Sequence, residues 1–554
     1  MANKKRILIL GGGFGGIYAA RQLEKVLKPE EASIQLVNQE NYWVYQPMLP
    51  EVISSSIGIT NVVSPIRRLC KRTHLVMREV ENIDLKNKIV TVSPGFKPRK
   101  LELSYDYLVI ALGAVTNFYG MPGMIENAKP FRTLADALSL RNHVLRALEE
   151  ADVETDPVLR AKLMTFVIAG GGFSGVEVVA ELNDFIHGVK RNYLRLRDQP
   201  ARVVLVHAGD RILPEMVEKL GLFAQKILSK RGVEIILNDR LAAASSEKAI
   251  FKSGVEIPCK TIVSTVPSAL SPVLDKLVCT KERGRLLVNG NMELAGYEGE
   301  VWALGDCSAA KTKAGNVVPP TAQHAIREAT TVALNIRAKM HGGPTSLFAF
   351  EGLGKLGSLG HFSAVAEVFG AKVSGIMAWL LWRGIYLMKM PGLNRKVRIA
   401  LDWLIALVFS PDLVQIKVLH ESGVERQHFE AGETIFNQGD VGDNVYVIEK
   451  GRCEVVREGG GVSQHIADLG DGDYFGEMAV LADVSRNATV IATNPTDLLL
   501  IHKDDFNQLK TSVAAFGKAF EKTAEERGRE SFVKTAEERG AAASARSGAE
   551  DSSK

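Results

Sequence analysis

A glycine-rich loop that occurs twice constrains this chain more than any other feature of its sequence. Each loop directly follows a short apolar run and is followed by an amphipathic stretch and then a second apolar run. This order of strand, turn, helix and strand predicts two βαβ units, each built on a parallel sheet. The loop glycines are Gly11, Gly13 and Gly16 in the first unit and Gly170, Gly172 and Gly175 in the second.

The G-x-G-x-x-G spacing of both loops has a physical explanation. The first glycine permits a tight turn, the second lets the backbone approach a pyrophosphate, and the third lets the helix pack on the strand. The following helix presents free N–H groups and a partial positive charge to the phosphates. Turn geometry alone could explain one such loop, whereas two in the same context predict two dinucleotide-binding domains.

The composition agrees with a large globular protein of several domains. With 554 residues the chain is too long for one ordinary core. Its 68 basic and 64 acidic residues nearly balance, which argues against a nucleic-acid partner. Five cysteines without a C-x-x-C pair exclude a clustered zinc site, so no metal is expected, and they indicate a reducing compartment. We expect the N-terminus, MANKKRILIL, to be a buried first strand rather than a secretory signal.

The acidic residue that usually binds the ribose hydroxyls is missing from both units. Asn38 stands at that place in the first unit, where Glu40 could supply the carboxylate instead. His207 stands there in the second unit. A carboxylate at this position repels a 2′-phosphate, so histidine removes the usual bar against NADPH. NADH and NADPH therefore both remain open for the second unit.

Five segments taken together resemble the type II NADH:quinone oxidoreductases, which are single-subunit and non-proton-pumping. The resemblance covers about residues 5–415. The strand that ends in Gly305-Asp306 by itself marks any flavoprotein with two dinucleotide domains, whereas all five segments in this order are specific. The segments are Asn41–Pro50, Tyr105–Gly113, Gly170–Glu177, Val301–Asp306 and Pro319–Ala325.

The resemblance implies that FAD binds the first unit and NADH or NADPH the second, with hydride passing from nicotinamide C4 to flavin N5. Asp306 would accept hydrogen bonds from the ribityl chain, and backbone N–H groups at Ala322 and Gln323 would face the flavin. The implied FAD-binding residues are Gly11, Gly13, Gly16, Asn38, Glu40, Ala111, Gly113, Gly305, Asp306, Ala322 and Gln323. The implied NAD(P)H-binding residues are Gly170, Gly172, Gly175, Glu177, His207 and Val266.

Glu177, Gln323 and Arg327 are the catalytic residues that the resemblance implies. Glu177 would lie by the nicotinamide, within the first helical turn after the second loop; a carboxylate that only complements the helix dipole is the alternative. Quinone would approach the flavin near Gln46, Gln323 and Arg327. Arg327 stands where the family commonly has a second glutamine, so its guanidinium could stabilise a developing quinol anion or could be solvated.

Two apolar stretches, Val373–Met390 and Val397–Phe409, are separated by Pro391-Gly392. Neither contains 18 uncharged apolar residues, so we expect two short helices that do not span a membrane. Their aromatic and basic side chains are typical of helices at headgroup depth. We therefore expect peripheral docking on the lipid of the cytoplasmic face of the cell membrane; a buried helix pair or a dimer interface is the alternative. The aromatic residues are Trp379, Trp382, Tyr386 and Trp403, and the basic residues are Arg383, Lys389, Arg395, Lys396 and Arg398.

Residues 419–515 have short alternating strands with glycine turns and resemble a cyclic nucleotide-binding domain. Arg486 would pair with the cyclic phosphate and Glu477 would accept a hydrogen bond from the ribose 2′-OH. Ala488 stands where cGMP-selective members often have threonine, which favours cAMP as the effector; a roll that binds nothing is the alternative. The implied cyclic-nucleotide residues are Gly476, Glu477, Met478, Ala479, Arg486, Asn487 and Ala488. Because the module follows the membrane segment, we hypothesise that its ligand shifts docking or quinone access.

The sequence thus predicts an α/β protein with two Rossmann-like domains, membrane-docking helices and a β-roll. The expected function is that of an FAD-dependent NAD(P)H:quinone oxidoreductase, with a homodimer left open. The expected boundaries are 1–160 with 284–350 for a discontinuous FAD-binding domain, 161–283 for the NAD(P)H-binding domain, 351–418 for membrane docking, 419–515 for the roll and 516–554 for a disordered tail.

Other classes on the same fold fit the cysteine pattern less well. Disulfide reductases and sulfide:quinone oxidoreductases need cysteines beside the flavin, yet none lies between Cys70 and Cys259, and Cys307 stands alone after its strand. Two further alternatives remain. One is a flavin and cyclic-nucleotide redox sensor with little turnover, and the other is an NAD(P)H reductase with a soluble acceptor.

Overall fold

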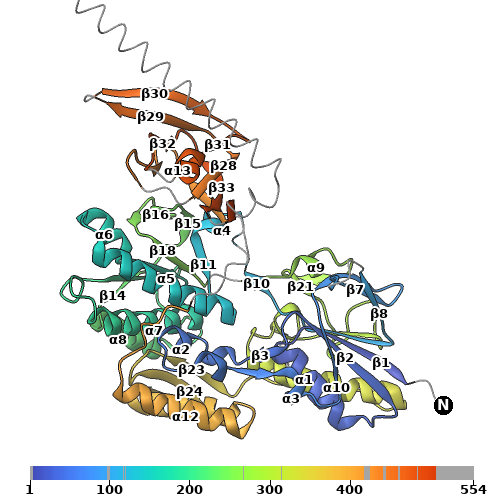
Figure 1. The fold of residues 1–554 in the computed structure, drawn as a ribbon. Helices are drawn as coiled ribbons and strands as arrows, with labels where there is room; N and C mark the ends of the chain where they lie inside the picture. Colours follow the sequence, from blue (N-terminus) through green and yellow to red (C-terminus); the bar gives the residue numbers. More distant parts are fainter. Residues whose placement is uncertain are drawn as a thin grey trace, which may run out of the picture. The chain divides into compact units, whose positions relative to one another are not determined.

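The chain forms two compact units in a computed structural model (Figure 1). The first unit lies within residues 1–119, 129–241 and 259–415, and the second within residues 120–128, 242–258 and 416–554. The structure describes residues 4–95, 100–116, 118, 120–265, 268–312, 315–416, 425–440, 444–459, 462–482, 485–503 and 505–506.

The first dinucleotide fold is a parallel five-stranded sheet in the order β22-β9-β1-β2-β5. Residues 7–10 of its central strand are at most 1% exposed, because a parallel sheet is covered on both faces. Helices α1 (Phe14–Val26) and α10 (Ala322–His341) pack against each other beside the sheet (Figure 1). The strands are β1 (Lys5–Leu10), β2 (Ala32–Asn38), β5 (His74–Met77), β9 (Tyr107–Ile110) and β22 (Val301–Ala303).

Smaller elements surround this first fold. They are β3 (Tyr42–Val44), the 3₁₀ helix η1 (Gln46–Met48), α2 (Pro50–Ile53), η2 (Ile59–Asn61), β4 (Val63–Pro65), α3 (Ile66–Leu69), β6 (Val80–Asp84), β7 (Ile89–Val92), β8 (Leu101–Ser104), β20 (Lys281–Glu282), β21 (Arg285–Leu286) and η3 (Gly305–Cys307).

The second dinucleotide fold is a five-stranded sheet in the order β11-β18-β12-β13-β14. Helix α7 (Phe173–Lys190) begins directly after the second glycine loop and packs on the sheet. The two folds are joined by β10 (Val115–Thr116) and β19 (Ser268–Ala269), which pair with each other. The strands are β11 (Ala128–Pro130), β12 (Thr165–Ala169), β13 (Arg202–Val206), β14 (Val233–Ile236) and β18 (Thr261–Ser264), and the remaining helices are α5 (Leu134–Val153), α6 (Pro157–Leu163), α8 (Glu218–Lys230) and α9 (Pro272–Asp275).

A third layer of the first unit follows α10. It is an antiparallel sheet of β23 (Gly354–Ser358), β24 (Ala364–Val368) and β25 (Ala371–Gly375), followed by helices α11 (Ile376–Lys389) and α12 (Leu393–Val408). Gly392 separates the two helices with φ +90°, as the Pro-Gly pair predicted. Among the described residues, no helix has both the length and the apolar character needed to cross a bilayer.

The second unit contains a roll of two antiparallel sheets, β26-β33-β28-β31 and β27-β32-β29-β30, as the sequence predicted. Two segments from the middle of the chain belong to this unit: α4 (Met124–Asn127) and the meander β15 (Leu241–Ala244), β16 (Lys248–Phe251) and β17 (Glu256–Pro258). The roll elements are β26 (Glu425–Phe429), β27 (Thr434–Phe436), β28 (Asn444–Lys450), β29 (Cys453–Gly459), β30 (Val462–Leu469), β31 (Tyr474–Phe475), α13 (Glu477–Ala482), β32 (Thr489–Ala492) and β33 (Thr496–His502).

Two sequence predictions concern residues outside the described part of the chain. Val266, a predicted NAD(P)H-binding residue, lies there. The tail predicted over residues 516–554 lies there as well.

Candidate active site

The first glycine loop forms a tight cradle at the start of α1. Gly11 has φ +101°, and an added Cβ there would strike the carbonyl of Ala111. A Cβ on Gly16 would strike the carbonyl of Gly11, whereas a Cβ on Gly13 would meet open space. No side chain caps α1, and its first turn has no acidic residue. The cradle therefore leaves free backbone N–H groups and room on one side, which fits a dinucleotide pyrophosphate.

The second glycine loop repeats this geometry at the start of α7. Gly170 has φ +117°, and a Cβ on Gly175 would strike the carbonyl of Gly170 and come within 2.8 Å of the Thr265 hydroxyl. Helix α7 is likewise uncapped and has no acidic residue in its first turn. Thr265, which the sequence analysis did not identify, closes this loop by donating from Oγ1 to the carbonyl of Ala169 at 2.9 Å.

Asn38 and His207 hold the glycine loops in place. Asn38 Oδ1 accepts from the Gly12 N–H at 2.7 Å, and His207 Nδ1 accepts from the Gly171 N–H at 3.1 Å. A ring nitrogen that accepts belongs to a neutral imidazole, and burial lowers the pKa of His207 accordingly. The two residues thus occupy equivalent positions and perform the same structural task.

Glu40 and Glu215 are both exposed, and the backbone carbonyl of Glu40 accepts from Nδ2 of Asn38 at 2.8 Å. A Cβ on Gly172 would lie 3.2 Å from Oε1 of Glu215. Glu215 is 40 residues or more from the loop in sequence, so spacing did not reveal it. It brings back the negative charge that is missing at His207.

Asp306 lies at the end of β22, as predicted, and forms an ion pair with Arg132 at 3.3 Å. The adjacent Gly305 has φ +73°, and its N–H donates to Oε2 of Glu328 at 2.6 Å. Glu328 is 1% exposed, and burial raises its pKa to about 7. Arg132 and Glu328 therefore join the predicted residues at this strand end.

Glu177 is the fifth residue of α7 and lies past the first turn, so its predicted place within that turn is wrong. Its side chain is buried and reaches strand β23, where Oε1 accepts from the Ser358 N–H at 3.0 Å. Burial raises the pKa of Glu177 to about 8. A protonated carboxyl that is hydrogen-bonded to another element carries no charge that could complement the helix dipole. This argues against the alternative in which Glu177 only complements that dipole.

An acidic cluster that the sequence analysis missed lies around Arg383 of α11. Arg383 Nη2 lies 3.3 Å from Oε1 of Glu51, and the Trp403 indole donates to Oε2 of the same carboxyl at 3.0 Å. Glu181, one helical turn after Glu177, accepts from the Ser54 hydroxyl. Burial raises the pKa of both Glu51 and Glu181. The sequence offered little indication of this cluster, because its residues come from three segments that are far apart in the chain.

The predicted quinone residues have different surroundings. Gln323 donates from Nε2 to the Gly354 carbonyl at 3.2 Å and accepts at Oε1 from the Leu353 N–H at 3.0 Å. Its amide therefore anchors the strand after α10. Arg327 is exposed, with its guanidinium 5.2 Å from the centroid of the Phe350 ring, and Gln46 is exposed on η1.

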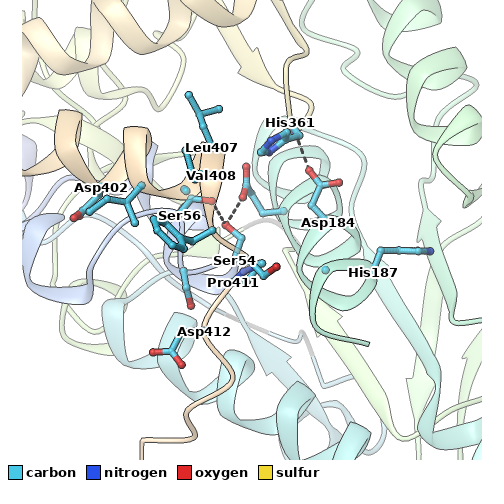
Figure 2. A pocket seen from close by; sticks show the side chains of 18 of the residues that line it. Ser54, Ser56, Asp184, His187, His361, Asp402, Leu407, Val408, Pro411 and Asp412 are labelled. Atoms are coloured by element: carbon cyan, nitrogen blue, oxygen red, sulfur yellow. Dashed lines mark hydrogen bonds between the residues drawn. The ribbon is translucent and has the colours of Figure 1, made fainter. Parts of the chain in front are cut away.

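A cleft of about 590 Å³ opens beside the acidic cluster (Figure 2). Figure 2 shows the end of α12, including Leu407 and Val408, on one side and polar side chains such as Asp184 and His187 of α7 on the other. His361 donates from its backbone N–H to Oδ2 of Asp184 at 2.8 Å. Glu181 and Arg383 of the acidic cluster also line the cleft.

The tryptophans of α11 and α12 are not the exposed aromatic belt that the sequence predicted. Trp379, Trp382 and Trp403 are at most 7% exposed. Their rings are used inside the protein: the Arg383 guanidinium lies 4.1 Å from the Trp379 ring centroid and 4.4 Å from that of Trp403. The exposed apolar residues of the two helices have no aromatic ring, and Phe409 directly after α12 adds one: Ile376, Met377, Leu380, Met388, Leu393, Val397, Leu401, Leu404, Ile405, Leu407, Val408 and Phe409. We call this set the apolar face.

The predicted cyclic-nucleotide residues come together in the roll. Arg486 is buried, donating from Nη1 to the Gly476 carbonyl at 2.7 Å and from Nη2 to the Asn444 carbonyl at 2.8 Å. Its guanidinium lies 4.2 Å from the centroid of the Phe436 ring. Glu477 is 2% exposed. Nearby, Ala488 and Ala479 are buried, and Asn487 Nδ2 lies 3.4 Å from Sδ of Met478.

The paired dinucleotide folds with their uncapped glycine cradles define an oxidoreductase of the pyridine nucleotide-disulphide oxidoreductase class, and the profile of that family matches residues 5–329. The profile of the NDH2 C-terminal domain matches residues 353–412, and that of the cyclic nucleotide-binding domain matches residues 426–512.

Known relatives narrow the class. The chain is 30% identical over 425 residues to the type II NADH:quinone oxidoreductase NdhA of Mycobacterium tuberculosis, covering 73% of this chain and 87% of the relative. It is 30% identical over 411 residues to the demethylphylloquinone reductase NdbB of Synechocystis, covering 72% and 96%. The fold resembles that of NDH2 from Plasmodium falciparum with a TM-score of 0.68 at 18% identity, over 74% of this chain and 100% of the other. The chain belongs to the type II NADH:quinone oxidoreductases, fused to a C-terminal cyclic nucleotide-binding domain.

Proposed function

We propose that this protein is an FAD-dependent NADH:quinone oxidoreductase that docks on a lipid surface and binds a cyclic nucleotide. The observation that carries the proposal is the pair of uncapped cradles at α1 and α7, each with a glycine that leaves no space for a Cβ against the loop carbonyl. When bound, FAD would supply the ring that accepts a hydride and passes two electrons on.

The residues of this chain would position the reactants. The loop N–H groups at Gly13 and Gly172 would hold the two pyrophosphates, and Asn38 and His207 would keep those loops in shape. Glu177 would present a neutral carboxyl beside the nicotinamide at pH 7, since its pKa lies at about 8. In that state it can donate a proton near the site of quinone reduction.

We propose NADH rather than NADPH as the preferred substrate. The Glu215 carboxylate lies next to the second loop, where it would repel the additional phosphate of NADPH. His207 offers that phosphate no positive charge, because its ring is neutral and already accepts from the loop.

The apolar face of α11 and α12 supports docking on a membrane. Isolated exposed apolar residues are ordinary, but the twelve of the apolar face, which lie on two helices that follow one another in the chain or directly after them, are typical of a docking surface. Arg398 is exposed beside this set and would face anionic headgroups. A quinone dissolved in lipid would then be within reach of the docked enzyme.

An anaerobic titration of the purified full-length protein tests the proposal. We expect a yellow protein whose flavin absorbance is bleached by one equivalent of NADH and restored by decylubiquinone or menadione. A protein that stays colourless after FAD is added would contradict the proposal. Bleaching by NADH without reoxidation by quinone would favour a soluble acceptor or a redox sensor.

A further inference from the structure

We propose that one face of the roll transmits cyclic-nucleotide binding to the NADH-binding fold and so changes the affinity for NADH. The inference rests on the proposed function, because it requires both ligands to bind. It differs from the hypothesis based on sequence adjacency, which connects the roll to membrane docking. The contacts of the roll with residues 120–128 and 242–258 involve segments inserted along the chain of the dinucleotide folds instead.

The roll packs on two segments that interrupt the dinucleotide folds. Residues 120–128 connect β10 to β11 and therefore lead from the first fold into the second. Residues 242–258 form most of the meander inserted between β14 and β18 of the second fold. The two segments are joined by the Ala244 N–H, which donates to the Pro122 carbonyl at 3.0 Å. Along the chain the first segment continues into β11 and the second is followed by β18, and both strands belong to the sheet that carries the second glycine cradle.

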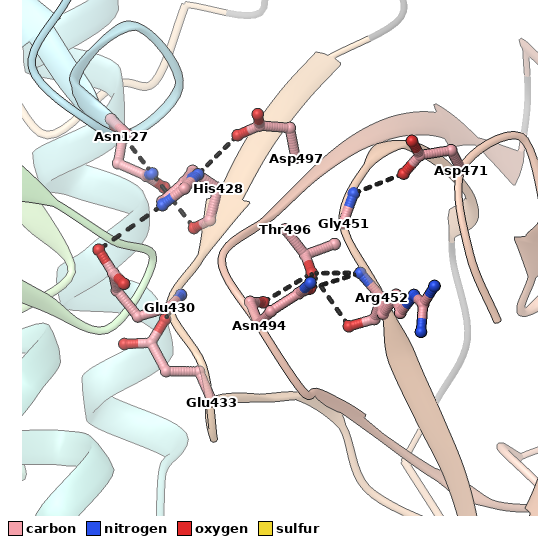
Figure 3. Close-up of polar contacts among 11 residues, drawn as sticks. Asn127, His428, Glu430, Glu433, Gly451, Arg452, Asp471, Asn494, Thr496 and Asp497 are labelled. Atoms are coloured by element: carbon pink, nitrogen blue, oxygen red, sulfur yellow. Dashed lines mark hydrogen bonds and ion pairs between the residues drawn. The ribbon is translucent and has the colours of Figure 1, made fainter. Parts of the chain in front are cut away.

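The first contact is centred on His428 of β26 (Figure 3). Helix α4 packs on β26, and Asn127 Nδ2 donates to the carbonyls of Gly123 at 3.0 Å and His428 at 3.4 Å. The His428 imidazole is buried and lies 2.6 Å from Oδ1 of Asp497 on β33. Gly123 has φ +63°, and a Cβ there would strike the Ala244 carbonyl and lie 2.8 Å from the His428 ring. The connection, the meander and the roll are therefore packed without spare room at this point.

The second contact joins Ser245 of the meander to Glu433 of the roll. The Ser245 hydroxyl donates to Oε1 of Glu433 at 2.7 Å, and Oε2 of the same carboxylate accepts from the Glu430 N–H at 2.9 Å. Glu433 directly precedes β27, which ends at Phe436. The contact therefore lies three residues from the ring that packs under Arg486.

Arg486 connects the candidate ligand site to both contacts. Its guanidinium donates to the carbonyls of Gly476 and Asn444 and lies over Phe436. A cyclic phosphate that pairs with Arg486 competes for the same N–H groups and for the same position of the guanidinium. Phe436 is the last residue of β27, and Glu433 directly precedes the first residue of the same strand. Asn444 opens β28, which pairs with β33, the strand that carries Asp497 against His428.

This arrangement meets the physical requirement for coupling. A ligand shifts an equilibrium only when it makes different contacts in the two states, and Arg486 offers such a difference. Coupling is also reciprocal: if cAMP changes the affinity for NADH by a factor, NADH changes the affinity for cAMP by the same factor. Coupling factors between two sites in one protein are usually about 5–150-fold.

Calorimetry on the FAD-loaded, full-length protein tests the proposal. The dissociation constant of a non-reacting NADH analogue, tetrahydro-NADH, is measured with and without saturating cAMP, and that of cAMP with and without the analogue. We expect both constants to change by the same factor, about fivefold or more. In the same preparation, binding to liposomes of phosphatidylglycerol and phosphatidylcholine should stay unchanged when cAMP is added.

A matched pair of variants locates the coupling. Ser245→Ala removes the hydroxyl that contacts Glu433, whereas Ser253→Ala removes an exposed hydroxyl from the same meander. We expect Ser245→Ala combined with Asn127→Ala to bring the coupling factor to within about twofold of unity, and Ser253→Ala to leave it unchanged. Unaltered FAD content and cAMP affinity show that the double variant is folded. If the double variant fails to fold, the two dissociation constants measured on the unaltered protein still show whether cAMP and NADH binding are coupled.

Several results would overturn the inference and leave the oxidoreductase intact. One is cAMP binding with no change in the affinity for the NADH analogue. Another is full coupling in the folded double variant, and a third is a cAMP effect confined to liposome binding. Absence of binding by both cAMP and cGMP would also overturn it, while NADH-dependent flavin reduction in the same sample would show that the proposed enzyme activity is real.

Discussion

The carboxyl groups of this protein illustrate how one residue type takes opposite roles in different surroundings. Glu177 is enclosed between α7 and β23 and has a pKa of about 8, whereas Glu215 is exposed at the second loop. Burial disfavours the charged form, so Glu177 can carry a proton at neutral pH, whereas the side chain of Glu215 is in contact with solvent. Each role leads to a separate test.

Glu177→Gln tests the protonated carboxyl. In the unaltered protein we expect kcat with NADH and a quinone analogue to fall as pH rises through about 8, because Glu177 then ionises. The variant keeps an acceptor for the Ser358 N–H but cannot donate the same proton, so we expect kcat to drop by about 10²-fold and the alkaline decline to vanish. Steady-state kinetics from pH 6 to 9.5 measure both. An unchanged alkaline decline in the variant would assign it to another group.

Glu215→Gln tests the choice of nicotinamide. Removing the carboxylate relieves a like-charge contact with the 2′-phosphate, so the ratio of kcat/KM for NADPH to that for NADH should rise on the order of tenfold. Glu218→Gln, three residues away at the start of α8, is the control and should leave the ratio unchanged. If both variants behave alike, the general charge of this segment determines the preference rather than Glu215.

At the scale of elements, the two glycine cradles depend on close approach between a helix and a loop. Gly175 lies against the Gly170 carbonyl, whereas Gly384 in α11 has nothing within 4 Å of its Cβ position. Gly175→Ala should therefore force the helix from the loop and weaken NADH binding by about tenfold or more while FAD content stays normal. Gly384→Ala should leave binding intact, since alanine is favourable in a helix. Fluorescence titration with NADH measures the difference.

The part of the apolar face that lies on α12 allows a test of membrane docking. Leu404 and Val408 are 61% and 77% exposed and lie four residues apart, on the same side of the helix. The double change to glutamate should lower liposome binding by at least about tenfold, because each side chain loses about 1.5–3 kcal/mol of burial in lipid.

The matched control for docking places the same two charges elsewhere. Leu194 and Val278 are 79% and 89% exposed, and their double change to glutamate should not affect flotation with liposomes. NADH oxidation by ferricyanide, a soluble acceptor, should be unchanged in both double variants. Equal loss of flotation in both would mean that net charge decides binding and that the apolar face does not dock.

At the scale of the whole molecule, buried carboxyls make stability depend on pH. The folded-state pKa values of Glu177 and Glu328 lie at about 8 and about 7, above the ordinary value of 4.5 for a glutamate side chain. The folded state therefore binds more protons than the unfolded state between pH 4.5 and 7, and the free energy of unfolding falls as pH rises through this window. Glu328→Gln should remove on the order of 3 kcal/mol of this fall. The pH dependence of the apparent Tm measures it, with exposed Glu102→Gln as the control.

The sequence by itself determined the local architecture. The apolar runs at residues 6–10, 166–169 and 301–303 became strands, the G-x-G-x-x-G spacings became cradles, and the Pro391-Gly392 pair divided the last two helices of the first unit. These features follow from neighbouring residues, because backbone freedom and short-range periodicity are encoded within a few positions.

Only the tertiary structure decided which side chains meet across long distances in sequence. It placed Arg383 between Trp379 and Trp403, against the expectation of an exposed aromatic belt, and it brought Glu51 and Glu181 to the same cluster. It also placed Glu215 at the second loop and His428 against Asn127. Composition shows that a helix has aromatic, apolar and charged residues, but the partners available on neighbouring elements determine which of them are buried, because a buried charge must find its counter-charge in the packed core.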